Sequence, residues 1–391
     1  AIGLTMTPPS RVLVLVTFTL STLLAACGSS TSDSRVDGAG GMGGSGGSGG
    51  ETPATYRELG PFAAGVTTLE LDDRQVEVWY PSDPASVDGL EPYSYFIRDY
   101  LSDLLQGLLE DDVNPPFVTD AYWQIAPSTE GPFPLVVFAH GASSYRNQSA
   151  FLTAHLASWG FVVASVDYLE RGLPSFLGPT PDPPIGDVEL TRSVVTLLSD
   201  ENQREGALLE GKVSTDRIAI TGHSAGGGTS IRFANEPDVI TYIPLSAGIS
   251  SERPTELADK PSLWLTGTTD GIVAPERTID AFDAAPSPAR LVLIEDMGHL
   301  GPSDICTIGD SGGGVIAIAL EAGLPIPDNL VRLGTDGCGE DDVIQEGWPI
   351  VRHFVTAQLR WAFGFDEEPV GLSQEVQSEF PEATFEYDES L

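Results

Sequence analysis

The stretch Gly222-His223-Ser224-Ala225-Gly226 is the most informative part of the sequence, because of the residues on either side of it. The β-branched and apolar segment 217–221 precedes it, and small residues that can open a helix follow it from 226 to 234. A serine held between a strand and a helix lies on a strained turn that exposes its hydroxyl. Glycines two positions away on each side avoid a clash there. The sequence therefore predicts that Ser224 is a nucleophile.

The overall composition limits the classes of function. The chain has 391 residues, of which 41% are hydrophobic, enough for one large α/β domain with appendages or for two small domains. It carries 57 acidic and 19 basic residues, a net charge of −38. So acidic a chain disfavours binding to nucleic acid or to an anionic membrane through charge. We expect a monomer without a nucleic-acid partner.

The N-terminus has the pattern of an export signal. Arg11 precedes an apolar run over residues 12–26 that is too short to span a membrane together with its flanks. The run ends in Leu24-Ala25-Ala26-Cys27, which resembles the bacterial lipobox, where the cysteine is lipidated and becomes the mature N-terminus. We expect a signal peptide over 1–26 and a lipid anchor on Cys27. This implies the cell envelope, at the outer membrane or cell surface. An ordinary cleaved signal with an unrelated cysteine is the alternative.

The rest of the chain divides by composition. Residues 27–58 are rich in glycine and serine and form a predicted linker. The serine motif recurs there around Ser45 and Ser48 without a preceding strand, so we assign these copies to the linker. We expect a catalytic domain over 59–365. Because 366–391 carries nine acidic and no basic residues, we expect it to be a solvated or loosely docked tail.

Strand and helix patterns alternate through the predicted domain. Continuous apolar runs, typical of strands buried on both faces, occur at 134–139, 161–166, 217–221, 239–245, 262–266 and 290–294. Helical spacing occurs at 148–159, 187–198 and 347–361. Such alternation implies right-handed crossovers and a mostly parallel, doubly wound sheet with helices on both faces. A serine turn after a strand of such a sheet is the arrangement of the α/β-hydrolase fold.

Two insertions and one antiparallel strand complete the predicted domain. Alternating residues at 75–80 predict an early strand that ends at Pro81. The insertion 85–131 is rich in aromatic and acidic residues and contains a predicted helix over 93–109, and a second insertion covers 301–345. We expect both insertions to form the rim of a substrate pocket.

A serine hydroxyl needs a base to accept its proton and an acid to orient that base. In the α/β-hydrolase fold the chain order is serine, acid, histidine. His299 directly follows the last predicted strand, and we predict that it is the base. His140 and His223 lie within glycine motifs, and we expect His140 to be a structural hydrogen-bonding residue. The remaining histidines lie in predicted helices and are His155 and His353.

The predicted acid is Asp270, in the turn that follows strand 262–266. Its carboxylate would lie at the carboxyl end of a parallel strand, where ligands bind in open α/β sheets. An aspartate before a glycine is also a common turn residue. Asp296 and Asp304, which lie close to His299 in the chain, are the alternatives.

The oxyanion of an acyl-transfer reaction needs two backbone N–H groups directed at one point. One should come from Ala225, directly after the nucleophile, and the other from Ala142 in the loop after strand 134–139. Gly141 lets that loop turn inward. No cofactor is needed for this chemistry.

Three cysteines are present. If Cys27 carries lipid, Cys306 and Cys338 remain, and an exported protein favours a disulfide between them. Two unrelated buried thiols are the alternative. No histidine or further cysteine accompanies either residue at ligand spacing, so we expect no metal site.

Two longer stretches, 133–141 and 156–164, resemble secreted platelet-activating factor acetylhydrolases, dienelactone hydrolase-like esterases and cutinase-like polyester hydrolases. The resemblance covers about residues 60–300 and the last helix. The acetylhydrolases carry their acid after the strand that follows the nucleophile helix. This chain has Leu245-Ser246-Ala247 there, and Asp270 matches the later position of the other two branches. Polyester hydrolases also place aromatic residues where this chain has Ala142 and Ala247-Gly248.

The resemblance and the predicted triad together imply a lipid-anchored serine hydrolase that cleaves carboxylic esters through an acyl-enzyme. The expected substrates are small-molecule or lipid esters with short to medium acyl chains. Phospholipid sn-2 acyl groups and polyesters are further classes that the resemblance implies. Lactonase, amidase or acyl-transfer activity would use the same triad. A hydrolase fold without activity, used as a surface binding module, is the alternative from another class of protein.

Overall fold

The computed structural model describes residues 55–101, 106, 107, 109, 114–176, 180–249, 255–308, 314–323 and 326–388. The predicted signal peptide, Cys27 and most of the predicted linker lie outside these residues. All described residues belong to one compact unit, Thr52–Leu391. No helix among them is long and apolar enough to cross a membrane.

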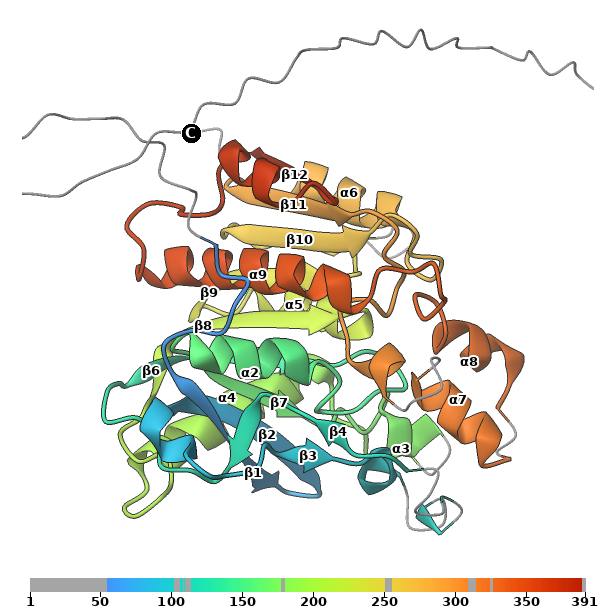
Figure 1. The fold of residues 1–391 in the computed structure, drawn as a ribbon. Coiled ribbons are helices and arrows are strands. Elements are labelled where there is room, and N and C mark those ends of the chain that lie inside the picture. Colours follow the sequence, from blue (N-terminus) through green and yellow to red (C-terminus); the bar gives the residue numbers. More distant parts are fainter. Residues whose placement is uncertain are drawn as a thin grey trace, which may run out of the picture. The chain divides into compact units, whose positions relative to one another are not determined.

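A ten-stranded sheet forms the centre of this unit (Figure 1), in the order β12-β11-β10-β9-β8-β6-β7-β2-β1-β5. Neighbouring strands from β7 through β6, β8, β9 and β10 to β11 are parallel. Antiparallel pairs lie towards the edges, between β2 and β7, β1 and β2, and β11 and β12. The chain therefore has the mostly parallel α/β sheet that the alternation predicts. The strands are β1 (Ala63–Leu71), β2 (Arg74–Ser82), β5 (Ala121–Trp123), β6 (Phe133–Ala139), β7 (Val162–Val166), β8 (Val213–His223), β9 (Val239–Leu245), β10 (Ser262–Gly267), β11 (Ala289–Ile294) and β12 (Ala383–Asp388).

Helices cover both faces of the sheet (Figure 1). Side chains alternate accordingly along β6: Val136 and Phe138 join the core under α2 and α9, whereas Leu135 and Val137 join the core under α4, α5 and α6. The first pair of helices is α2 (Ala150–Ser158) and α9 (Trp348–Phe363), and the second set is α4 (Asp187–Gln203), α5 (Ala225–Phe233) and α6 (Pro275–Ala284). Shorter helices are α3 (Leu173–Phe176), α7 (Gly314–Glu321) and α8 (Asp328–Leu333), with 3-10 turns at Pro84–Val87, Ile97–Tyr100, Ile305–Thr307, Gln345–Gly347 and Gln374–Glu379.

The predicted helix over 93–109 is wrong for residues 93–101, and residues 102–105 lie outside the described part. Ser94–Tyr95 instead form β3, which pairs antiparallel with β4 (Phe117–Val118), and a 3-10 turn follows. The Tyr95 ring lies 5.0 Å from that of Phe117 and 5.8 Å from that of Tyr100. These aromatic contacts between distant segments outweigh the local helical spacing. The predicted end of the early strand at Pro81 is also wrong, because β2 continues to Ser82.

Of the two expectations for 366–391, a solvated tail or a loosely docked one, the solvated tail is wrong for the residues described. β12 pairs with β11 along six residues and forms the edge of the sheet. Phe380 and Phe385 are buried, and the rings of both pack against Phe354 of α9. The acidic composition hid these apolar side chains: Phe385 lies on the inward face of an otherwise exposed strand, and Phe380 lies just after the preceding 3-10 turn.

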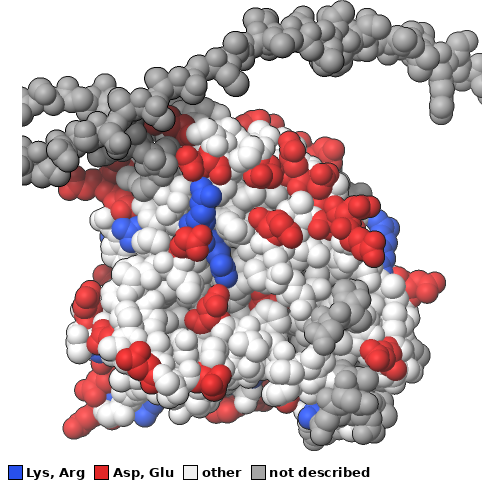
Figure 2. Space-filling view, in the orientation of Figure 1, with Lys and Arg blue, Asp and Glu red and all other residues white. Residues whose placement is uncertain are grey.

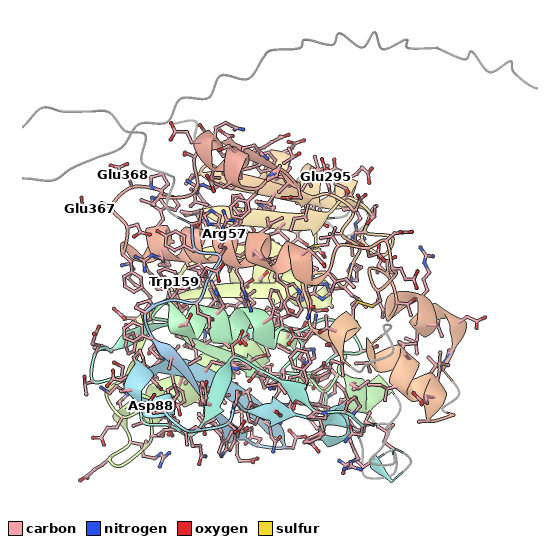
Figure 3. The ribbon with its side chains drawn as sticks, in the orientation of Figure 1. Arg57, Asp88, Trp159, Glu295, Glu367 and Glu368 are labelled. Atoms are coloured by element: carbon pink, nitrogen blue, oxygen red, sulfur yellow. A yellow bond between two sulfur atoms is a disulfide. The ribbon has the colours of Figure 1, made fainter. Side chains whose placement is uncertain are left out.

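The predicted linker likewise ends earlier than residue 58. Tyr56 is buried, donates its N–H to His353 Nδ1 at 3.0 Å and packs edge-on against Trp159. Arg57 forms an ion pair with Glu379 at 3.2 Å. Figure 3 shows Arg57 and Trp159 beside α9, where the described chain begins. One aromatic ring therefore fixes the start of the domain.

The second insertion carries α7 and α8 and contains the predicted disulfide, between Cys306 and Cys338. Both helices stand beyond the carboxyl ends of the parallel strands (Figure 1). The bond ties Cys338, near the end of this insertion, to Cys306, near its start. Figure 2 shows acidic side chains spread over the visible face of the molecule, in agreement with the composition.

Candidate active site

Ser224 lies on the turn between β8 and α5, with φ of 55° and ψ of −117°. A positive φ is strained for a residue other than glycine and persists only where the surroundings enforce it. Here the enforcing contacts come from glycines. A Cβ at Gly226 would lie 1.9 Å from the carbonyl oxygen of Ala139, and a Cβ at Gly222 would lie 2.5 Å from that of Gly226. The two motif glycines therefore allow β8, α5 and β6 to meet at backbone contact.

The structure brings the three residues of the predicted triad together. His299 Nε2 lies 2.9 Å from Ser224 Oγ, and His299 Nδ1 lies 2.9 and 3.0 Å from the two carboxylate oxygens of Asp270. Asp270 and His299 are both buried, at 4% and 0% exposure. Asp270 Oδ1 also accepts the N–H groups of Ile272 and Val273, at 3.0 and 2.7 Å, and these bonds orient the carboxylate.

The two alternative acids have other positions. Asp296 is exposed, and its backbone makes its hydrogen bonds: its N–H donates to Thr268 Oγ1, and its carbonyl accepts the N–H of Val343. Asp304 is buried, and its carboxylate accepts the N–H groups of Ala150 and Phe151 at the start of α2, at 2.6 and 3.2 Å. Burial raises the pKa of Asp304 well above its ordinary value. The geometry therefore favours Asp270 as the partner of His299.

The loop after β6 has its polar backbone groups paired on both sides of Ala142. Gly141 N–H donates to Gln148 Oε1 at 2.6 Å, and Gly141 C=O lies 2.8 Å from His140 Nδ1 and 3.0 Å from Arg171 Nη1. In a trans peptide, the N–H of Ala142 points opposite to the C=O of Gly141. No partner is recorded for the Ala142 N–H among the described residues. The loop thus presents this donor away from Arg171.

The second predicted donor is the N–H of Ala225, the first residue of α5. N–H groups in the first turn of a helix have no partner within the helix. Ser224 N–H is already donated to the carbonyl of Leu245 at 2.9 Å. The backbone N–H that remains unpaired in this turn among the described residues, next to the serine hydroxyl, is therefore that of Ala225.

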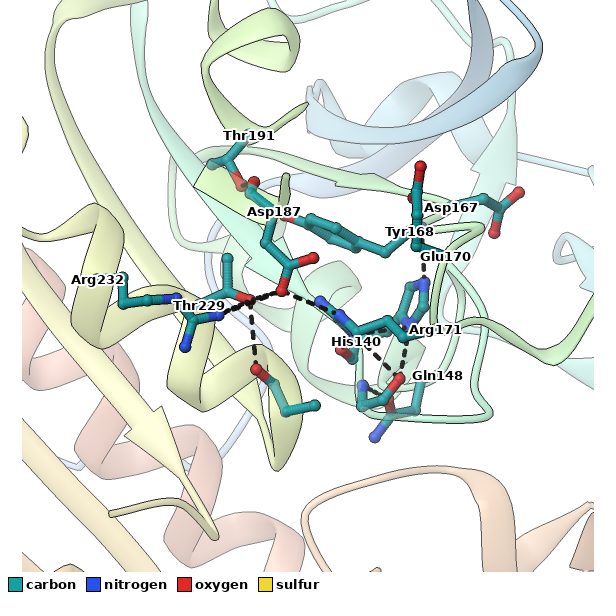
Figure 4. A network of polar contacts seen from close by, with 12 residues as sticks. His140, Gln148, Asp167, Tyr168, Glu170, Arg171, Asp187, Thr191, Thr229 and Arg232 are labelled. Atoms are coloured by element: carbon teal, nitrogen blue, oxygen red, sulfur yellow. Dashed lines mark hydrogen bonds and ion pairs between the residues drawn. The ribbon is translucent and has the colours of Figure 1, made fainter. Parts of the chain in front are cut away.

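A polar network supports the loop that carries Ala142 (Figure 4). His140 Nε2 accepts the N–H of Tyr168 at 3.0 Å, so its other nitrogen carries the proton that binds Gly141 C=O. Burial lowers the pKa of His140 well below its ordinary value, which keeps the ring neutral. The expected structural role of His140 agrees with these contacts.

Arg171 extends this network to two helices. Its guanidinium donates to the carbonyls of His140 and Gly141, and its Nε lies 3.3 Å from Asp187 Oδ2 at the start of α4. The same Asp187 oxygen accepts Thr229 Oγ1 of α5 at 2.7 Å. The sequence analysis missed Arg171 and Asp187, because no local motif marks them.

A second chain of bonds joins the loop to the base. His223 Nε2 lies 2.7 Å from the carbonyl of His299 and must therefore carry the proton, since a carbonyl can only accept. His223 Nδ1 then accepts the amide of Gln148, 2.6 Å away, whose oxygen holds Gly141. Burial lowers the pKa of His223 to about 3. Neutral His223 thus links the serine turn, the Ala142 loop and the backbone of the base.

An apolar pocket opens beside the serine and the base. Both insertions contribute to its wall, and no Asp, Glu, Lys or Arg lines it among the described residues. Besides Ser224, His299 and Ala142, its aliphatic lining is Ile97, Leu101, Leu109, Leu173, Leu300, Ile305, Val315, Ile316, Ile318, Ala319, Ile326, Leu330 and Leu333. Ser224 also borders a second, more polar cleft that contains Arg232 and Arg277.

The described residues contain no cluster of three histidine, cysteine or acidic side chains that could hold a metal ion.

Comparisons with known proteins agree with a hydrolytic site. The Chlorophyllase family model matches residues 106–250, less than half of the chain. A bis(hydroxyethyl) terephthalate hydrolase of Streptomyces coelicolor is 28% identical over 120 residues, 30% of this chain and 34% of that protein. Cutinase 1 of Thermobifida cellulosilytica and a cutinase of Thermobifida fusca are each 26% identical over 121 residues, 31% of this chain and 42% and 36% of those proteins. The matches span about a third to two-fifths of these relatives, and they support ester hydrolysis in general.

Proposed function

We propose that this protein is a serine esterase of the α/β-hydrolase fold that cleaves carboxylic esters through an acyl-enzyme. The observation that carries the proposal is the position of His299, within hydrogen-bond distance of both Ser224 Oγ and the Asp270 carboxylate. A base held between a nucleophile and an orienting acid is the arrangement that activates a serine hydroxyl. The similarity to cutinases supports the same class of reaction.

In the proposed reaction, Ser224 Oγ attacks the ester carbonyl carbon while its proton passes to His299 Nε2. The N–H groups of Ala225 and Ala142 stabilise the negative oxygen of the tetrahedral intermediate. Collapse of this intermediate breaks the bond to the alcohol oxygen, which takes the proton from His299. Water then attacks the acyl-serine with His299 again as base, and the carboxylic acid leaves. Asp270 holds His299 in the tautomer that this cycle needs.

The substrate class that we propose is esters of aliphatic acids with short to medium chains. The branched aliphatic wall of the pocket suits a flexible hydrocarbon chain and offers no charged partner. At the positions where polyester hydrolases carry aromatic residues, this chain has Ala142, Ala247 and Gly248. A flat aromatic acid would therefore find no ring to stack on at these positions.

We also propose that the protein is anchored in the cell envelope by lipid on Cys27. The short apolar run, the small residues before the cysteine and the glycine- and serine-rich segment after it support this. Replacing Cys27 with serine should move the protein from the detergent phase to the aqueous phase in a partition experiment, or block its processing. An unchanged partition would leave the segment as an ordinary signal or an uncleaved anchor.

Labelling with a fluorophosphonate tests the proposed function directly. We expect the wild type to be labelled and Ser224→Ala to remain unlabelled, with kcat on short nitrophenyl esters lower by at least about 10⁴-fold. The half-buried hydroxyl is small and contributes little packing, so the melting temperature should change little. A series of nitrophenyl esters from acetyl to palmitoyl measures the acyl preference. Absence of labelling in the wild type would support a binding module, and transfer of the acyl group to an added alcohol would support a transferase.

A further inference from the structure

The disulfide-closed insertion reaches back to the candidate active site through one short turn. Asp336 lies in this turn, two residues before Cys338, and Gly337 lies between them. A Cβ at Gly298, next to the base, would lie only 2.4 Å from the Cα of Gly337. The turn therefore packs at backbone contact against the loop that carries His299.

The carboxylate of Asp336 binds the loops of both the acid and the base. Its Oδ1 accepts the backbone N–H of His299 at 2.8 Å and that of Gly271 at 3.1 Å. Its main-chain carbonyl accepts the N–H of Leu300 at 2.9 Å. Gly271 directly follows Asp270, so a single oxygen atom joins the residue after the acid to the base itself.

Another bond between these loops lies further from the catalytic side chains. Thr269 N–H donates to the carbonyl of Met297 at 3.2 Å, one residue before the acid and two before the base. The bonds of Asp336 to His299 and Gly271 therefore lie nearer to the two catalytic side chains than the Thr269–Met297 bond does. The space around it is tight, because a Cβ at Gly271 would lie 2.4 Å from Asp336 Oδ2.

We propose that Asp336 is a positioning residue that holds Asp270 and His299 at their working separation. This proposal rests on the proposed esterase function. The imidazole lies 2.9 Å from Asp270 and 2.9 Å from Ser224, so a small shift of either loop breaks one of these bonds. Misplacement by about 1 Å can lower the rate of an enzyme by about a hundredfold. The effect should appear in kcat, since Asp336 does not line the apolar pocket.

The chain offers a matched control in the same insertion. Asp342 Oδ2 accepts the N–H of Gly339 at 2.7 Å, so it too is a carboxylate that binds backbone in a turn. No contact between Asp342 and the loops of Asp270 or His299 is recorded for the described residues. Loss of Asp342 therefore reports the effect of loosening a turn of the insertion alone.

The test compares Asp336→Ala, Asp336→Asn, Asp342→Ala and Ser224→Ala on nitrophenyl acetate, a substrate too short to fill the pocket. Asp336→Ala should lower kcat about 10- to 100-fold with little change in KM. Asp336→Asn keeps an oxygen that can accept both bonds and should retain most of the wild-type kcat. Asp342→Ala should behave like the wild type.

Two results would overturn the proposal: equal kcat in Asp336→Ala and Asp342→Ala, or equal loss in Asp336→Ala and Asp336→Asn. If Asp336→Ala does not fold, Asp336→Glu replaces it, since the longer side chain displaces both bonds and should lower kcat in a folded protein. Wild-type activity in Asp336→Glu would then contradict the proposal. A wild type no more active than Ser224→Ala would instead contradict the esterase function.

Discussion

The two halves of the candidate active site are held in place in different ways. The serine half comprises the turn at Ser224, which is fixed by steric contacts with the centre of the sheet, and the loop at Ala142, which the hydrogen bonds of Gln148 and Arg171 support. Gly226 touches the backbone of Ala139 there, and no side chain could fit between them. The base half, which comprises the loops of Asp270 and His299, depends on hydrogen bonds to a carboxylate from a distant turn, that of Asp336.

This difference determines what each half can tolerate. A steric contact within the sheet is as stiff as the close-packed core. Hydrogen bonds from an insertion can hold a loop in place only as well as the insertion itself is held. His223 is the point where the two halves meet, because it follows the glycine of the serine motif and binds the carbonyl of His299. The base half should therefore be the more easily disturbed one.

The largest effect should come from removing the charge of the acid. Asp270→Asn should lower kcat by up to about 10⁴-fold, because an amide cannot hold His299 in the required tautomer or stabilise the imidazolium. Asp296→Asn should stay close to the wild type, since Asp296 is exposed and its hydrogen bonds to Thr268 and Val343 are made by its backbone. Steady-state kinetics on a short ester measures both variants. Similar activity in the two, or loss only in Asp296→Asn, would place the acid elsewhere.

The contrast also explains which parts could be predicted from the sequence. The strand–serine–helix pattern is local, so Ser224 and its glycines were visible within the single continuous stretch 217–234. Asp270 and His299 were predictable because the fold fixes their order and because each follows an apolar strand. Asp336, Arg171 and Gln148 act on residues at least seven positions away, and their partners cannot be recognised before the chain is folded.

In the fold, too, local patterns could be predicted from the sequence and contacts between distant residues could not. The buried parallel strands were predicted within a few residues, because their apolar runs are continuous. The segment 93–101 and the edge strand β12 were not, since each is stabilised by aromatic contacts with distant residues, Phe117 for the first and Phe354 for the second. Composition alone suggested a helix and a solvated tail there.

The pH dependence of activity tests whether the junction between the halves stays intact in acid. Burial holds the pKa of His223 at about 3 and that of His140 well below its ordinary value, so both rings stay neutral down to acid pH. Protonation of these two rings should therefore add nothing to the pH dependence of activity above about pH 4. We expect log(kcat/KM) to fall on the acid side with a slope no steeper than one, about tenfold per pH unit. A slope of two above about pH 4 would mean that one of these two rings takes up a proton there.

A smaller effect should come from the support of the Ala142 loop. Arg171→Ala removes the guanidinium that binds the carbonyls of His140 and Gly141 and frees the peptide that directs the Ala142 N–H. Loss of an oxyanion donor costs about 10²- to 10³-fold in kcat, and loosening one should cost less, about 10- to 100-fold. Affinity for a boronic acid that mimics the tetrahedral intermediate should fall with kcat, while KM changes little.

Added guanidinium should partly restore the activity of Arg171→Ala if the defect is local. Arg192→Ala is the matched control. Arg192 of α4 pairs with Asp238 and Glu236, which lie between α5 and β9, and it contacts neither His140 nor Gly141. An Arg171 variant as active as the Arg192 variant would show that the steric contacts of the serine half suffice without this network.

The smallest effect should come from opening the disulfide between Cys306 and Cys338. The two cysteines are separated by 32 residues, and closing such a loop stabilises the fold by about 3–4 kcal/mol in the chain-entropy model. Replacing both cysteines with serine should therefore lower the melting temperature. It should also lower kcat about three- to tenfold, because Asp336 loses its fixed attachment two residues away while its own bonds remain possible.

The route of this effect can be tested with a double-mutant cycle. If the disulfide acts on the base half through Asp336, opening it in the Asp336→Ala background should lower kcat little further, although the melting temperature still falls. In the Asp342→Ala background, the full loss of kcat should remain. Additive losses in both backgrounds would mean that the disulfide and Asp336 act separately.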